Sequence, residues 1–223
     1  DYQRQGYDCI KFKTDLEDDV VGWAESIARS APGMKIILDP NQRWENSASA
    51  RRLLADLEAI KNTLLIEDPI PKWMFNEYGD LRRFTSIPII QHVALPYVSQ
   101  GQRVHDIVNM IEHRSVDGFN FNAGLAKFKQ MDAIASAANL CCLHGSEVDL
   151  GVLEAMYLHQ VAAASSCAWP SDIFGRMIRE HDLLITPLQV EPPFATIPTG
   201  PGLGVDLDDR AIEKYCQTER VFE

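Results

Sequence analysis

The stretch Lys35-Ile-Ile-Leu-Asp-Pro-Asn-Gln-Arg-Trp44 indicates the fold of this chain. Three branched apolar residues lead directly to Asp39, and Pro40, which cannot donate a ladder hydrogen bond, ends the extended run. A short continuous apolar run is typical of a parallel strand that is buried on both faces. A carboxylate at the end of such a strand lies where α/β sheets and barrels bind their ligands. We therefore predict a buried strand that ends in a functional carboxylate.

The same pattern recurs along the chain. Apolar strands are predicted to end near residues 13, 39, 67, 92, 122, 144 and 169, which places them 22 to 30 residues apart by subtraction. Amphipathic helices are predicted over residues 15–31, 46–60, 104–111, 125–138 and 148–164. Repeated strand–helix units imply parallel strands with right-handed crossovers, and seven of them favour a TIM-type barrel. Because a closed barrel has eight strands, we expect the first strand to precede residue 1.

Composition limits the partners of the chain. A formal charge of −11 over 223 residues argues against nucleic acid and anionic membranes as ligands. Five cysteines without paired spacing indicate reduced thiols and a cytoplasmic location. The strand–helix pattern ends before residue 181, so we predict a barrel domain over residues 1–180. Residues 181–223, which include a Pro/Gly-rich stretch over 182–205, are expected to form a tail that packs on it.

Functional side chains gather at the predicted strand ends. Lys11 and Lys13 share one face of the first strand, and Asp39, Glu67 and His92 end the next three strands. Each residue alone has an ordinary structural explanation, such as helix capping or a surface pair. Together they place three potential ligands of a divalent cation beside two lysines that can act as acid and base.

The motifs that carry this arrangement resemble those of a known family. They are Lys11-Phe-Lys13, Asp39-Pro-Asn41, Ile66-Glu-Asp-Pro69 and Gly200-Pro-Gly-Leu-Gly-Val205. In this order they resemble the barrel domain of the enolase superfamily, in the group of mandelate racemase and muconate lactonizing enzyme. The resemblance implies a (β/α)7β barrel with an N-terminal α+β capping domain. The chain would then lack the capping domain and the first barrel strand.

The resemblance also implies a mechanism and a cofactor. Mg²⁺ held by Asp39, Glu67 and a third ligand would stabilise an enediolate formed from a small carboxylate substrate. Lys13 would transfer the proton, with Lys11 as its neighbour. The resemblance further implies a homo-oligomer, and it assigns secondary contacts to Asn41 and Asp68.

Two positions depart from the family pattern. The third ligand position carries His92 where an acid is usual, so Mn²⁺ or another divalent cation becomes an alternative to Mg²⁺. The strand ending at residue 122 offers Asn120 and Asn122 where some members have a lysine. His144 then becomes the expected acid opposite Lys13.

Rim residues and reaction alternatives complete the predictions. Glu147 and Asp172 are expected to line the site with the two asparagines as substrate contacts. Because an imidazolium can protonate a departing hydroxyl, His144 favours dehydration of a sugar acid. Racemisation or epimerisation by the same residues is the alternative. The third alternative is an inactive relative of these enzymes that has lost its metal and only binds ligand, since His92 replaces an acid.

Overall fold

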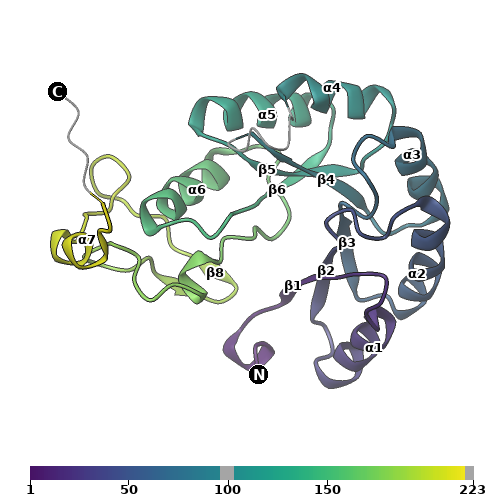
Figure 1. The fold of residues 1–223 in the computed structure, drawn as a ribbon, viewed down its shortest axis with the longest axis horizontal. Coiled ribbons are helices and arrows are strands. Elements are labelled where there is room, and N and C mark those ends of the chain that lie inside the picture. Colours follow the sequence, from purple (N-terminus) through teal and green to yellow (C-terminus); the bar gives the residue numbers. More distant parts are fainter. Residues whose placement is uncertain (96–102, 219–223) are drawn as a thin grey trace.

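The computed structural model describes residues 1–95 and 103–218, and its core is a parallel sheet of six strands in sequence order. The sheet curls, and the helices lie along its outer side (Figure 1). The strands are β1 (Cys9–Lys13), β2 (Lys35–Asp39), β3 (Thr63–Glu67), β4 (Ile89–Ala94), β5 (Gly118–Asn122) and β6 (Cys141–His144). The six strand ends predicted between residues 13 and 144 are confirmed to within two residues.

Side chains alternate along each strand and so give the sheet two different faces. Ile36 and Leu38 of β2 belong to the apolar cluster that includes residues of α1, α2 and α3. The residues of opposite parity pack with one another on the inner face. They are Ile37, Leu65, Ile90 and Leu143. This apolar layer fills the inner face of the sheet below the carboxyl ends of the strands. The polar residues predicted for the site lie beyond it, at those ends.

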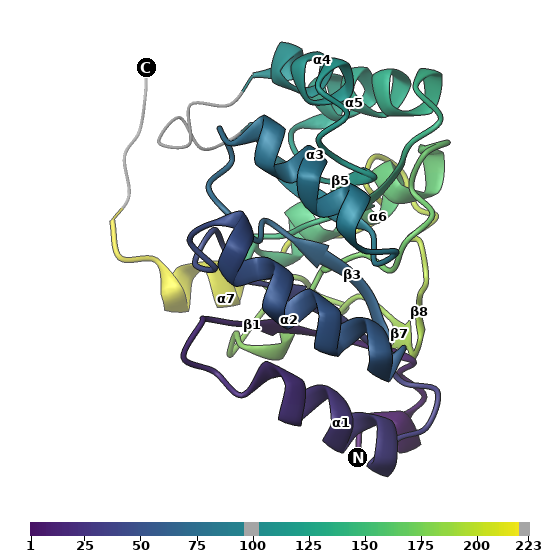
Figure 2. The same ribbon diagram turned by 90° about the vertical axis from the view of Figure 1, so that its right-hand side faces the viewer.

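Six helices cover the outer face, one after each strand, and Figure 2 shows the first five stacked along it. They are α1 (Val20–Ser30), α2 (Ser47–Ile60), α3 (Phe75–Phe84), α4 (Val104–Glu112), α5 (Leu125–Ala137) and α6 (Gly151–Ala163). In α2, the Asn46 side chain accepts hydrogen bonds from Ala48 N and Ser49 N and thus caps the helix. Leu54 and Leu57 are fully buried, and each such leucine is worth about 1.5–3 kcal/mol.

The seventh strand, predicted to end near Trp169, does not form as a strand. The segment pairs with β6 through one isolated parallel bridge, between Cys142 and Cys167, rather than through a ladder. Pro170 lacks the N–H group that would extend the ladder, although Asp172 N still donates to His144 O at 2.8 Å. The observed fold is therefore an α/β half-barrel of six parallel strands, and the predicted barrel is confirmed only to that extent.

The C-terminal segment packs on α6. It contains β7 (Val190–Glu191), β8 (Phe194–Ala195) and α7 (Asp209–Tyr215), with short 3-10 turns at η1 (Gln3–Gln5) and η3 (Gly175–Met177) elsewhere. Leu184 and Leu188 form an apolar cluster with Ala155 of α6. Arg179 pairs with the buried Glu154 at 3.0 Å. Within the described parts of the chain, no helix is long and apolar enough to cross a membrane.

Candidate active site

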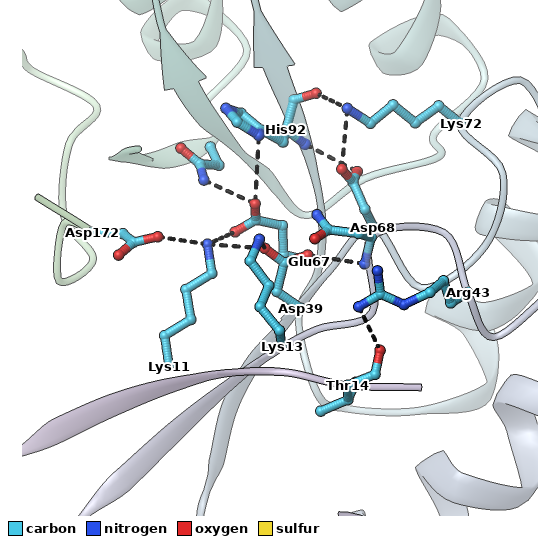
Figure 3. A network of polar contacts seen from close by, with 12 residues as sticks. Lys11, Lys13, Thr14, Asp39, Arg43, Glu67, Asp68, Lys72, His92 and Asp172 are labelled. Atoms are coloured by element: carbon cyan, nitrogen blue, oxygen red, sulfur yellow. Dashed lines mark hydrogen bonds and ion pairs between the residues drawn. The ribbon is translucent and has the colours of Figure 1, made fainter. Parts of the chain in front are cut away.

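The lysines of β1 lie over the carboxylates of β2 and β3 at the carboxyl ends of these strands (Figure 3). Lys11 Nζ lies 2.9 Å from Glu67 Oε2, 2.8 Å from Asp172 Oδ2 and 3.1 Å from Asp39 Oδ2. Lys13 Nζ lies 2.6 Å from Asp39 Oδ2. Parallel pairing in register sets this contact, because Lys13 is the partner of Asp39 in the sheet.

The two lysines differ in their surroundings. The side chain of Lys11 is 14% exposed and that of Lys13 is 59% exposed. Burial would lower the pKa of Lys11, but the three carboxylates around it outweigh burial and raise this pKa well above its ordinary value. Lys11 is therefore a fixed cation. Lys13 pairs with the Asp39 carboxylate, and its side chain nevertheless stays accessible to solvent. A group that exchanges protons with a substrate must be accessible in this way.

The carboxylates of β2 and β3 respond in opposite ways. Burial would raise the pKa of Asp39, but Lys11 and Lys13 lower it to about 2. Burial raises the pKa of Glu67 to about 8, and the nearby charges of Asp39 and Asp68 add to this effect. Lys11, 2.9 Å away, lowers the pKa of Glu67, but by less than burial raises it.

Glu67, Asp68 and His92 form a candidate metal site. Each offers a ligand atom, and these atoms lie within 4.8 Å of one another. His92 Nδ1 lies 3.7 Å from Glu67 Oε1, and the buried Nε2 has no hydrogen-bond partner among the described residues. Burial, followed by the charges of Lys72 and Lys11, lowers the pKa of His92 well below its ordinary value, so the imidazole is neutral.

These residues fit a divalent cation. Burial raises the pKa of Asp68 to about 6, as it raises that of Glu67. The positive charges nearby therefore do not compensate for the burial of these two carboxylates. A neutral imidazole with an unpartnered nitrogen and two carboxylates is a donor set for Mn²⁺ and related metals, and the carboxylates also suit Mg²⁺. Asp39, predicted as a ligand, lies against the two lysines, and Asp68, predicted as a secondary contact, belongs to the cluster. The role of Asp39 as a ligand stays a prediction.

Left-handed backbone conformations shape the loops that follow β2 and β3. Asn41 has φ 47° and Asp68 has φ 46°. The turn at Asn41 lets its backbone N–H donate to Asp39 Oδ1 at 3.0 Å, so this predicted site residue acts through its main chain. Gln42 N donates to Asp68 O at 2.7 Å and ties the two loops together.

The predicted amides of β5 lie on the inner face. Asn120 Nδ2 donates to Glu67 Oε1 at 2.9 Å and thereby orients this carboxylate. Asn122 follows two residues later on the same face, and its side chain is completely buried. Glu147 is exposed. Burial raises its pKa, and Lys13 lowers it most among the nearby charges.

The structure places His144 away from these residues. Its ring is fully buried between Phe128 and Tyr157, with centroid distances of 4.8 and 4.4 Å. Nε2 pairs with Gln160 of α6 at 2.7 Å, and Nδ1 pairs with Gly145 O at 2.6 Å. Because Leu143 occupies the inner face of β6, the next residue points to the helices. We therefore no longer assign His144 a catalytic role.

Lys72 is a site residue that the sequence analysis missed. Its Nζ lies 3.1 Å from Asp68 Oδ2 and donates to His92 O at 2.6 Å. The residue follows Pro71 in a loop, where neither periodicity nor a strand end marks it. One sequence signal was available: Lys72 follows Asp68 by four residues. Residues at this spacing come into contact only where the chain turns between them.

Parallel strands whose carboxyl ends bring lysines and acids to a candidate cation site define a barrel-type α/β domain. A family model described as "Enolase C-terminal domain-like" matches residues 1–211. The chain therefore belongs to this family, and the resemblance inferred from the motifs is confirmed.

Similar proteins agree with this assignment. Muconate cycloisomerase 1 of Rhodococcus opacus is 24% identical over 215 residues, which cover 93% of this chain and 56% of the relative. Chloromuconate cycloisomerase of Pseudomonas putida is 25% identical over 223 residues, covering 96% and 58%. The chain thus spans little more than half the length of these relatives.

Solved structures share the fold. The 2-chloromuconate cycloisomerase from Rhodococcus opacus superposes with a TM-score of 0.85 at 25% identity, covering 97% of this chain and 58% of that one. The N-succinyl Arg/Lys racemase from Bacillus cereus has a TM-score of 0.84 at 21% identity, with coverages of 97% and 58%.

Proposed function

We propose that this chain is the catalytic half of a divalent-metal-dependent isomerase that transfers a proton at the carbon α to a carboxylate. The observation that carries the proposal is the position of Lys13. Its accessible side chain ends at Asp39, beside the acids and imidazole of the candidate metal site. An acid–base group and a cation site next to each other are what an enediolate reaction requires.

The residues divide the work. Lys13 exchanges the α-proton, and Asp39 holds its ammonium group in place. Lys11 remains charged and is positioned to attract the substrate carboxylate, while Asn120 orients Glu67. Glu67, Asp68 and His92 would hold the cation, Mg²⁺ or Mn²⁺, with Asp39 close by. The bound cation would supply the positive charge that stabilises the enediolate.

Isomerisation is supported better than dehydration. The similar proteins are cycloisomerases by name, and dehydration was inferred from His144 as the second acid. With His144 packed among helices, that support is lost. The side chains of β5 are amides, which do not exchange protons near neutral pH. We therefore favour an isomerisation in which Lys13 transfers protons on one face, and two-sided racemisation becomes the second candidate.

Metal binding and hydrogen exchange test this proposal. Full-length protein should bind Mn²⁺ and Mg²⁺ in calorimetric titrations. It should then exchange the α-hydrogen of one acid from a panel with solvent deuterium, and the panel includes muconolactone, N-succinyl amino acids and aldonic acids. Lys13→Ala should lower exchange and turnover by about 10²–10⁴-fold.

The matched control is Lys35→Ala, which removes an exposed lysine at the opposite end of β2. It should leave exchange unchanged. Failure of the wild-type protein to bind either metal would instead support a relative that only binds ligand, and normal exchange in Lys13→Ala would remove the proposed base.

A further inference from the structure

The carboxyl ends of β3 and β4 are joined by side chains rather than by the sheet. The ladder between these strands has two residue pairs and ends at Glu67 and Ile90, whereas the ladder between β4 and β5 continues to Ala94. The backbone N–H of Asp68 still donates to Ile90 O at 3.0 Å. Because backbone groups point to alternate sides along a strand, those of His92 point toward β3, as those of Ile90 do. They therefore need partners beyond the end of the ladder.

Asp68 and Lys72 supply these partners. His92 N donates to Asp68 Oδ1 at 3.1 Å, and Lys72 Nζ donates to His92 O at 2.6 Å. Lys72 Nζ also lies 3.1 Å from Asp68 Oδ2, so the three residues contact one another in a closed set (Figure 3). The carboxylate and the ammonium group thus take the place that the next residue of a neighbouring strand would have.

Lys72 is itself fixed at several points. Its backbone N–H donates to Gln42 Oε1 at 3.1 Å, and Gln91 Nε2 donates to Lys72 O at 3.3 Å. The side chain is only 16% exposed. A lysine stem is flexible in solvent, but here both the main chain and the ammonium group are bound. Lys72 can therefore set how far apart Asp68 and His92 lie.

This separation matters because Asp68 and His92 are two of the three residues of the candidate metal site. We propose that Lys72 is a positioning residue that keeps the His92 imidazole at coordinating distance from the acids of this site. The inference rests on the proposed function and deepens it, because it assigns the choice of metal to a residue that is not a ligand. A nitrogen ligand favours Mn²⁺ over Mg²⁺, so the selectivity between these metals depends on where the imidazole lies.

The ratio of Mn²⁺ to Mg²⁺ affinity tests the inference, and calorimetric titration of full-length protein with each metal gives this ratio. Lys72→Met removes the bonds to His92 and Asp68. It should lower the ratio about tenfold or more, the usual scale when a residue that orients a ligand is lost. Loss of positive charge alone would strengthen the binding of both divalent cations alike and leave the ratio unchanged.

Two further variants support this measurement. Lys72→Arg, which keeps a charged donor, should retain most of the wild-type ratio. Lys129→Met, which changes an exposed lysine of α5, is the matched control and should retain all of it. An unchanged ratio in Lys72→Met, from a wild type that binds both metals, overturns the inference.

Amide hydrogen exchange without metal separates this inference from the proposed function. The His92 N–H should exchange faster in Lys72→Met than in the wild type, because Asp68 loses the cation that holds it. The Ile66 N–H, which donates to Pro88 O, should exchange at the wild-type rate. An unchanged rate at His92 overturns the inference. Absence of metal binding in the wild type overturns the proposed function, and the rate at His92 then still decides whether Lys72 positions this residue.

Discussion

The two halves of the curled sheet carry different chemistry at their carboxyl ends. Strands β1 to β3 end in the charged groups of the site, and the amine and carboxylate of Lys13 and Asp39 are paired within the fold. Strands β4 and β5 end in uncharged groups, and His92, Asn120 and Asn122 each have a buried atom without a hydrogen-bond partner among the described residues. Charges in low dielectric must be neutralised locally, whereas a neutral amide or imidazole can be left to a ligand. In the proposed function, the charged half therefore supplies reactivity, and the neutral half supplies contacts for what is bound.

The largest expected effect comes from removing charge in the first half. Glu67→Gln should abolish turnover and weaken Mn²⁺ binding at least about 100-fold, because an amide is a poor replacement for a ligand carboxylate. Glu25→Gln, which changes an exposed acid of α1, is the matched control. Calorimetry and turnover measure the difference. Equal Mn²⁺ affinity in both variants would mean that Glu67 serves only to pair with Lys11.

Adding charge to the second half should have the next largest effect. His92→Glu replaces a neutral nitrogen ligand by an oxygen, so it should preserve or tighten Mg²⁺ binding and reduce the preference for Mn²⁺. Competition titrations of the two metals give this ratio. A folded His92→Glu variant that no longer binds Mg²⁺ would show that this strand end does not face the metal.

The pH dependence of stability should reflect the same asymmetry. Because the pKa of Glu67 is about 8 in the fold against 4.5 as its ordinary value, the folded protein binds more protons than the unfolded chain between these values. The contribution of Glu67 to metal-free stability should therefore fall as the pH rises through this range. The fall should be clearest above pH 6.5, because His92 and His144, whose pKa values are lowered from 6.5 in the fold, oppose it only below that pH. Mn²⁺ binds the ionised carboxylate, so the stabilisation it gives should grow over the same range.

Thermal unfolding at several pH values, with and without Mn²⁺, measures both slopes. Glu67→Gln should flatten the metal-free slope, since the amide does not titrate. A slope that is the same in this variant would assign the pH dependence to another group.

The smallest effect on activity is expected outside both halves of the site. His144→Asn should leave α-hydrogen exchange within about twofold of the wild type, because the ring faces α5 and α6. It should lower stability by about 1–3 kcal/mol, since Gln160 loses its partner in a buried position. Unfolding and exchange are measured on the same preparation. Loss of exchange in a stable variant would return His144 to the site.

The sequence predicted the candidate site well where the position of a residue at the end of a strand is enough to place it there. Lys13, Asp39 and Glu67 follow apolar runs whose length alone fixes where each strand ends, and the register then brings them together. His144 shows the limit. It also ends a strand, but its direction depends on which parity faces inward, and the short run Cys141–His144 is apolar at both parities. Leu143 takes the inner face, and the histidine follows to the outer one.

Other features depend on tertiary contacts that no local pattern encodes. Lys72 reaches the site through a turn, and the unpaired state of Asn122 is a property of its surroundings. The missing seventh strand could have been inferred from Pro170, which interrupts the ladder next to the expected strand end.

The ion pair between Lys11 and Asp172 joins residues 161 positions apart in the chain. Closing so long a loop carries an entropic cost before the contact stabilises anything, and contacts of this separation slow folding. Lys11 also pairs with Asp39 and Glu67, which are much nearer in the chain, so the contact with Asp172 should be the last of the three to form. The charge balance of the candidate site is therefore expected to be complete only when the segment after β6 docks, which makes it a late marker of complete folding.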